Sequence, residues 1–322
     1  MWQLLALLNK RLVLAIPISM LAGVGFGLAI APRFLVHFIV PMTFVMVYPM
    51  MATLRLKNLL YWNDGKTQLV TQTLNFGVIP FIALGLGNVF FPEKPLYALG
   101  LFLASLLPTS GMTISWTGFA KGNLEAAVKM TVLGLTLGSL VTPFYLKAFM
   151  GETMHFEMLS VMRQIALVVF VPMILGHITR QYFIRKIGEK EFKQRLAPRF
   201  SGLSTIGVLG IVFISMALKA KSLAESPTDL LYIFGPVLLL YAVNYTLSTL
   251  TGKLLLPRGD AIALVYGSVM RNLSIALAVA LNSFGEHGPE IALVITVAFI
   301  IQVQSAAWYV RYTDRIFGHS TM

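Results

Sequence analysis

The segments "LPTSGMTISW" (residues 107–116) and "YGSVMRNLSI" (residues 266–275) interrupt two long apolar stretches with proline, glycine, hydroxyl and amide residues. Pro108 removes a backbone donor and clashes with the preceding turn, while Gly111 and Gly267 allow the chain to bend. In lipid, an irregular backbone persists only where protein or a water-filled cavity satisfies its polar groups. The two segments therefore predict two broken membrane helices, with Pro108, Gly111 and Gly267 at the hinges.

The composition places the rest of the chain in the membrane as well. Of 322 residues, 57% are hydrophobic and 12% are charged, whereas about a quarter are charged in a soluble domain. Because a soluble fold cannot bury this much apolar surface, we expect the lipid bilayer to be the solvent. The chain has no cysteine, which excludes disulfides, thiolate metal ligands and a cysteine nucleophile. No cofactor is predicted.

The hydropathy pattern predicts an all-α integral membrane fold of ten transmembrane helices. Each predicted helix is an apolar window of about 20 residues, the length that crosses the hydrocarbon core. The windows are 11–30, 35–54, 68–91, 96–119, 126–148, 160–183, 201–220, 229–252, 260–284 and 289–312.

The positions of the positive charges predict the orientation. Of the 25 Lys and Arg residues, 18 fall in connections on one side of the membrane and six on the other. Positive charge collects on the cytoplasmic side, so we expect a multi-pass protein of the cell (inner) membrane with both termini in the cytoplasm. The net charge of +12 does not indicate nucleic acid, because no basic patch is interleaved with aromatic residues.

A weak internal symmetry predicts that residues 1–322 form one membrane transporter domain of two repeats, at about 11–150 and 158–316. The first predicted helix contains "IPISMLAGVGFG" and the sixth "FVPMILGHITR", each with a proline followed by glycine. Five helices per half is an odd number, so the two repeats must be inverted. Inverted repeats with broken helices four and nine crossing are typical of secondary transporters.

The two interruptions together predict a substrate site. If they cross near the midplane, the N-termini of half-helices point into one cavity and favour an anion there. We expect the polar side chains of both interruptions to line this cavity: Thr109, Ser110, Thr113, Ser268, Arg271, Asn272 and Ser274. The alternative is that each interruption is a simple kink whose hydroxyls bond to nearby carbonyls.

Arg271 is the one charged residue near the middle of a predicted span. A charge at that depth costs about 2.5–3.5 kcal/mol on translocon scales. All thirteen acidic residues lie at or beyond predicted helix ends, so none is expected to neutralise Arg271. A guanidinium is suited to carboxylates and oxyanions, which makes Arg271 the expected binding residue for a small anionic solute. The alternative is a structural arginine that caps the broken helix.

Four stretches resemble the bile acid:sodium symporter superfamily, and within it the arsenite-permease branch. These are "VYPMMATLRLKNL" (47–59), "LNFGVIPF" (74–81), "SGMTISWTGFAKGN" (110–123) and "IALAVAL" (275–281). The resemblance implies ten helices in two inverted repeats, a panel and a core domain, and alternating access at a helix crossing. It also brings Asn75, in the third helix, into the expected site.

The chain departs from this family at the residues that bind substrate and ions. Arsenite permeases carry a cysteine where this chain has Thr109 and a glutamate where it has Ser274. In the sodium-coupled branch, a glutamate and a glutamine of the ion sites fall on Gly267 and Arg271. We therefore hypothesise that Arg271 supplies the positive charge that sodium supplies in relatives.

These features favour a secondary active transporter of a small organic anion or oxyanion that works by alternating access. An arsenite efflux permease and a sodium-coupled organic anion symporter are the alternatives, and a channel or receptor is a rival class. An enzyme is not expected, because no nucleophile with a base, no paired carboxylates and no metal cluster can be assembled inside the spans. The coupling ion, the direction of transport and the oligomeric state stay open.

Overall fold

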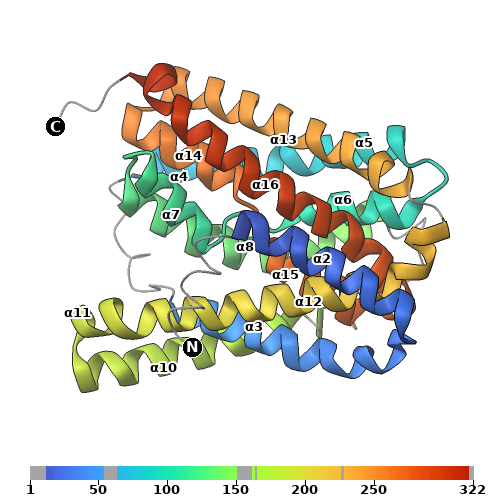
Figure 1. Cartoon of the computed structure of the whole chain (residues 1–322). Helices are drawn as coiled ribbons and strands as arrows, with labels where there is room; N and C mark the ends of the chain where they lie inside the picture. Colours follow the sequence, from blue (N-terminus) through green and yellow to red (C-terminus); the bar gives the residue numbers. More distant parts are fainter. Residues whose placement is uncertain (1–11, 54–63, 151–161, 164, 226–227, 319–322) are drawn as a thin grey trace. The chain divides into compact units, whose positions relative to one another are not determined.

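The computed structural model describes residues 12–53, 64–150, 162–163, 165–225 and 228–318, and every structural statement concerns this part of the chain. It is built from helices, with no strand in these ranges (Figure 1). The predicted all-helical architecture is confirmed. The predicted junction between the two repeats, between about residues 150 and 158, falls almost entirely outside the described residues, as does the end of the 47–59 stretch.

The chain divides into two compact units. Unit 1 consists of residues 1–54, 156–231 and 274–296, and unit 2 of residues 55–155, 232–273 and 297–322. Each unit thus combines segments from the first and the second half of the sequence. The predicted single domain and its inverted repeats stay predictions.

Unit 1 is a packed group of long helices with short irregular turns between them. It contains α2 (Leu12–Ala29), η1 (Pro32–Phe38), α3 (Ile39–Thr53), η3 (Ala166–Phe170), α10 (Val171–Ile187), α11 (Glu189–Glu191), η4 (Phe192–Leu196), α12 (Ala197–Glu225), α15 (Leu273–Ser283), η5 (Gly285–His287) and the start of α16 (Gly288–Phe317). Helix α12 packs on α2 and α3, and α10 packs on α3.

Glycines allow close packing against α12. A Cβ at Gly23 of α2 would lie 2.5 Å from the carbonyl oxygen of Phe213, and one at Gly27 would clash with the carbonyl oxygen of Ala217. Glycines four residues apart on one helix face are a common means of helix association in lipid, because they let backbones approach. The hydroxyl of Ser19 also donates to the carbonyl of Leu209 at 2.7 Å.

Unit 2 holds both interrupted segments. Its helices are α4 (Gly65–Gly77), α5 (Ile79–Phe90), α6 (Pro95–Leu106), α7 (Gly111–Phe119), α8 (Leu124–Met150), most of α13 (Thr228–Leu255), α14 (Arg258–Val269) and most of α16. Helix α14 packs against α4, α7 and α8. Every residue from Ala261 to Val269 is buried, so α14 forms the centre of the unit.

Seven helices of the described chain are long and apolar enough to cross a membrane, and the bent pair α6 and α7 makes an eighth candidate. Helix α2 is also apolar, but its apolar stretch, Leu14–Ala29, is slightly too short to count among the candidate membrane spans. These helices indicate a multi-pass membrane protein. The number ten stays a prediction.

A charged cluster ties together one end of unit 2. Lys129 of α8 is buried and donates to Asp64, at the start of α4, at 2.7 Å. In the first turn of α14, Asp260 accepts from the Thr67 hydroxyl and the Asn123 amide, each at 2.7 Å. The carboxylates here already have partners from neighbouring helices, as expected of acidic residues at helix ends.

Candidate functional site

The first interrupted segment ends α6 at Leu106 and begins α7 at Gly111, with a bend of 63° between the two helices. Thr109 takes a positive φ of 63°, which is rare for a β-branched residue and often marks a functional site. Its hydroxyl donates to the carbonyls of Pro108 at 2.7 Å and Thr131 at 3.1 Å. The residue with a left-handed backbone conformation is therefore Thr109. Gly111, which was predicted as a hinge, is instead the first residue of α7.

The next hydroxyls of this segment cap α7. The hydroxyl oxygen of Ser110 accepts from the backbone N–H of Met112 at 3.2 Å, and that of Thr113 accepts from the backbone N–H of Ser110 at 3.2 Å. This reciprocal arrangement is a capping box, which satisfies N–H groups that a helix start leaves free. The hydroxyls expected to line a substrate site thus also hold the helix start in place.

The second interrupted segment breaks at residues 270–272, between α14 and α15. Gly267, predicted as a hinge, lies inside the last turn of α14 instead. A Cβ there would lie 2.7 Å from the Met130 sulfur and 3.4 Å from Thr71 Cγ2. The glycine therefore serves close helix packing, and the helix is interrupted three residues later, at Met270.

The two interruptions contact each other directly. The backbone N–H of Asn272 donates to the carbonyl of Leu107 at 2.8 Å. The N–H of Asn272 and the carbonyl of Leu107 both belong to irregular stretches, outside the regular hydrogen bonding of a helix. In a membrane protein such groups need partners from protein or water, and here each interruption supplies one for the other.

Two asparagine amides satisfy carbonyls in the last turn of α14. Asn75 of α4 donates to the carbonyl of Gly267 at 3.0 Å, and Asn244 of α13 donates to that of Ser268 at 3.1 Å. The Ser268 hydroxyl in turn donates to the side-chain oxygen of Asn244 at 2.8 Å. Helix ends leave carbonyls without intrahelical partners, so both asparagines stabilise the end of α14.

Gln302 of α16 holds the backbone at the second break. Its side-chain oxygen accepts from the Arg271 N–H at 2.8 Å and from the Tyr241 hydroxyl at 2.8 Å. Its side-chain nitrogen donates to the Arg271 carbonyl at 3.1 Å. The Arg271 N–H is shared with the carbonyl of Val269 at 2.9 Å. Because Gln302 is fully buried, it replaces the partners that a continuous helix would provide.

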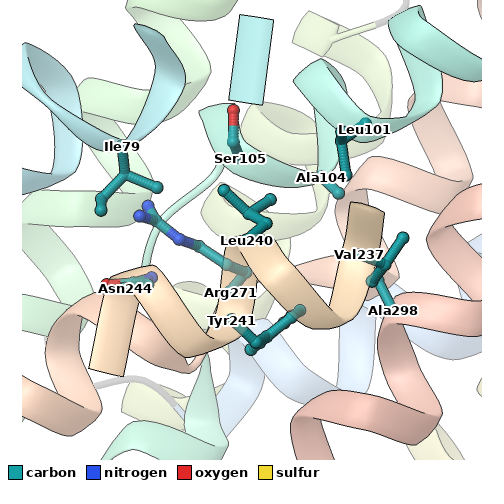
Figure 2. A pocket seen from close by; sticks show the side chains of 10 residues that line it. All are labelled: Ile79, Leu101, Ala104, Ser105, Val237, Leu240, Tyr241, Asn244, Arg271 and Ala298. Carbon is teal, nitrogen blue, oxygen red and sulfur yellow. The ribbon is translucent and has the colours of Figure 1, made fainter. Parts of the chain in front are cut away.

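The Arg271 side chain lines a cavity inside unit 2. Arg271 is 3% exposed, yet its Nε, Nη1 and Nη2 atoms have no hydrogen-bond partner among the described residues. The cavity is small, with a volume of about 10 Å³, and Figure 2 shows the side chain extending among the lining residues toward Ile79. The other lining residues are Leu101, Ala104, Ser105, Val237, Leu240, Tyr241, Asn244 and Ala298.

Of the eight residues predicted to bind substrate, Arg271 is the one that lines this cavity. Asn75 and Ser268 support the end of α14, as described above. Ser274 is the second residue of α15 and belongs to unit 1. Whether any of these residues touches a substrate stays a prediction.

Four polar residues at the site were not predicted from the sequence: Gln302, Asn244, Tyr241 and Ser105. Gln302 and Asn244 stand within the long helices α16 and α13, and a polar residue inside an apolar span is a signal that could have drawn attention to them. The pattern does not say which backbone group such a residue would meet, because that depends on tertiary packing.

Long apolar helices, two connected breaks and a buried unpaired guanidinium are the features of a multi-pass membrane protein with an internal polar site. The model of the sodium bile acid symporter family matches residues 40–226. This match covers more than half of the chain, and the chain therefore belongs to that family. Family members are transporters, so the protein is a membrane transporter and not an enzyme.

Known proteins from bacteria are similar over most of the chain. An uncharacterised protein of Bacillus subtilis, YbaS, is 25% identical over 234 residues, which is 72% of this chain and 73% of the relative. The arsenical-resistance protein Acr3 of Corynebacterium glutamicum is 21% identical over 271 residues, 80% of this chain and 73% of that protein. The uncharacterised sodium-dependent transporter YocS of Bacillus subtilis is 28% identical over 209 residues, with 64% and 62% covered.

Proposed function

We propose that this protein is a secondary active transporter that moves a small organic anion or oxyanion by alternating access, with Arg271 as the residue that binds the anion. The observation that carries the proposal is the buried guanidinium, which lines a cavity while its three nitrogens lack partners among the described residues. A buried charge without a partner costs several kcal/mol. A bound anion would offset that cost.

The geometry argues against the alternative that Arg271 caps the broken helix. The backbone groups at the break are satisfied by Gln302, Asn244 and Asn75. A capping arginine would direct its N–H groups at those carbonyls, but none of the guanidinium nitrogens has such a bond in the described chain. The fork of N–H groups therefore remains available for a carboxylate or oxyanion.

Recognition of the anion without sodium is part of the proposal. Arg271 is the single charged residue among those that line the cavity, so no carboxylate there could hold a cation beside the substrate. Met130 packs at Gly267, where the family resemblance implies an ion-site glutamate. We propose that the fixed positive charge of Arg271 replaces the bound ion.

The names of two relatives favour the alternative functions. Acr3, an arsenical-resistance protein, favours arsenite efflux, and YocS, a sodium-dependent transporter, favours sodium coupling. The absence of cysteine argues against a site for trivalent arsenic, which prefers thiolates. We also propose that the protein lies in the inner membrane, with both termini cytoplasmic and the two units built from two inverted repeats.

Counterflow in proteoliposomes tests this function. Vesicles preloaded with a candidate anion should take up the labelled anion at equal rates with sodium or choline outside. Arg271→Gln should lower the apparent affinity about 10- to 100-fold, the range expected for loss of hydrogen bonds to a charged group. The control is Arg195→Gln, whose side chain is exposed and paired with Glu191. Flux that requires sodium, or that is unchanged by Arg271→Gln, would reject the proposal.

A further inference from the structure

We infer that the substrate-free protein holds one chloride ion beside the Arg271 guanidinium, and that transport is an exchange of the substrate anion against chloride. The inference rests on the proposed function, in which Arg271 binds the substrate, and adds the ion that takes its place once the substrate has left. It follows from the missing partner of the guanidinium, the size of the cavity and the chemistry of its lining.

The Arg271 guanidinium needs a negative partner when no substrate is bound. The residue is 3% exposed, and its three side-chain nitrogens have no hydrogen-bond partner among the described residues. None of the described residues that line the cavity is acidic. Because a buried charge without a partner is costly, a carrier that returned without any anion would carry this cost through half of its cycle. A second anion removes the cost, which makes the transport an exchange.

The size of the cavity limits the second anion to a single atom. The volume in the conformation described is about 10 Å³, which is room for about one water molecule. A polyatomic anion would need the lining helices α5, α6, α13 and α16 to move apart. A monatomic anion, which is only slightly larger than water, needs no more than small shifts of the lining side chains. This conformation therefore suits a halide ion better than the polyatomic substrate.

The free donors of the cavity suit a halide as well. The Asn244 amide donates one N–H to the Ser268 carbonyl and accepts from the Ser268 hydroxyl, which fixes its orientation and leaves one N–H. This group and the N–H groups of Arg271 are the free donors. A halide ion accepts hydrogen bonds from any direction. It also has no further oxygens that would need donors on its other side, where the lining is apolar.

The apolar part of the lining distinguishes between the halides. Six of the lining residues are apolar: Ile79, Leu101, Ala104, Val237, Leu240 and Ala298. They cannot replace the hydrogen bonds of hydration water, so fluoride, the most strongly hydrated halide, loses most on entry. Iodide is weakly hydrated but large, and it would overpack so small a space. Chloride is the smallest halide without the hydration cost of fluoride, and we expect it to bind best.

Thermal unfolding of the purified full-length protein in detergent tests the binding. Potassium chloride, fluoride or iodide replaces potassium HEPES at constant ionic strength, because HEPES is too large for the cavity. Chloride should raise Tm at a concentration at least 10-fold lower than fluoride or iodide. The effect should disappear in Arg271→Gln and persist in Arg315→Gln, an exposed arginine of α16 that does not line the cavity.

Two further variants keep the binding test decisive if Arg271→Gln folds poorly. Arg271→Lys keeps the charge and loses only the planar fork, which a monatomic ion does not require, so the chloride effect should persist. Ala104→Val keeps Arg271 but takes up space in the cavity, so the chloride effect should be lost. The opposite result in either variant would overturn the chloride site.

Uptake into proteoliposomes tests the exchange. The vesicles contain potassium chloride or potassium HEPES and no substrate, and potassium with valinomycin on both sides prevents a membrane voltage from limiting the flux. Uptake of the labelled candidate anion should be at least 10-fold faster into the vesicles that contain chloride. Equal uptake into both would overturn the exchange, even if chloride raises Tm.

The outcomes separate this inference from the proposed function. If the candidate anion still exchanges against itself through Arg271, while chloride neither raises Tm nor supports uptake, the chloride inference is overturned and the proposed function stands. If no anion acts in an Arg271-dependent way, both are overturned.

Discussion

The side-chain amide of Gln302 bonds to both backbone polar groups of Arg271, accepting from its N–H at 2.8 Å and donating to its carbonyl at 3.1 Å. Gln302 thereby fixes the point from which the guanidinium enters the cavity. The guanidinium can remain free for an anion because a different side chain satisfies the break. We regard Gln302 as a positioning residue, since it acts on the anion only through Arg271.

Gln302→Leu should lower both stability and anion affinity. Leucine has about the volume of glutamine but cannot form hydrogen bonds. The N–H and the carbonyl of Arg271 would each lose one partner, and the Tyr241 hydroxyl would lose its acceptor. With about 1–3 kcal/mol per unsatisfied buried group, we expect the unfolding free energy to fall by about 2–4 kcal/mol. Denaturation in detergent measures the stability, and titration with the candidate anion of the counterflow assay measures the affinity.

Gln304→Leu is the matched control for this change, because Gln304 lies on the same helix, whereas the side chain that bonds to the Arg271 backbone is that of Gln302. Gln302→Glu is informative as well, since a carboxylate can still accept from the Arg271 N–H while its charge competes with the anion for the guanidinium. It should keep more stability than Gln302→Leu yet bind anions no better. Equal anion affinity in all three variants and the parent would show that Gln302 does not position Arg271.

Gly134→Ala should disturb the first break. A Cβ at this position would lie 2.6 Å from the Thr109 hydroxyl oxygen and 3.1 Å from its Cγ2. Thr109 already holds a positive φ, so it cannot easily move aside. Overpacking of this kind costs about 1–3 kcal/mol, which unfolding in detergent would detect as a lower Tm.

Gly85→Ala in α5 is the comparison for that substitution, because a Cβ at Gly85 would meet no described atom within 4 Å. Alanine favours a helix over glycine by up to about 1 kcal/mol, so this variant should be as stable as the parent or more stable. If both glycine variants lose the same stability, the close contact between Gly134 and Thr109 is not the cause of the loss in Gly134→Ala.

Lys129→Met should destabilise unit 2 strongly. The Lys129 side chain is 4% exposed and its Nζ lies 2.7 Å from Asp64 Oδ1, and removal of one member of a buried pair costs about 3–5 kcal/mol. The double variant with Asp64→Asn should recover part of this loss, because the carboxylate is then no longer left unpaired. Chemical denaturation of the single and double variants tests this, and a double variant no more stable than Lys129→Met would speak against it.

An exposed ion pair provides the reference for the buried one. Arg195 and Glu191 are 71% and 44% exposed, and surface pairs contribute about 0–1 kcal/mol. Arg195→Met should therefore change the stability little. A loss as large as that of Lys129→Met would mean that burial does not set the difference.

Much of the architecture was accessible from the sequence because lipid imposes strict rules. Length and hydropathy predicted the all-helical membrane fold, which the structure confirms. Pro108 and the hydroxyls after it correctly marked an interruption, since proline ends a helix locally. The count of ten spans and the inverted repeats were predicted in the same way and stay predictions.

The details of the site were less accessible, because they depend on contacts between distant segments. Gly267 was expected to bend the chain, but tight packing against Met130 requires a glycine there inside a helix. The hydroxyls of Ser110 and Thr113 were expected to line the site, and they cap α7. Gln302 lies 31 positions from Arg271, so no local pattern could join them.

Arg271 was identified from the sequence because charge inside an apolar span is expensive whatever the fold. The structure adds that its guanidinium is buried, unpaired in the described chain and directed into a cavity. Those three observations turn an unusual residue into a specific binding hypothesis.

Equilibrium binding of the candidate anion used in the counterflow assay, measured by calorimetry with the purified parent and Arg271→Gln, tests the central claim most directly. The account predicts one site per chain in the parent and at least a 10-fold weaker affinity in the variant, with the variant still folded. Equal affinity in the two proteins would show that the guanidinium is not the anion's partner and would contradict the account.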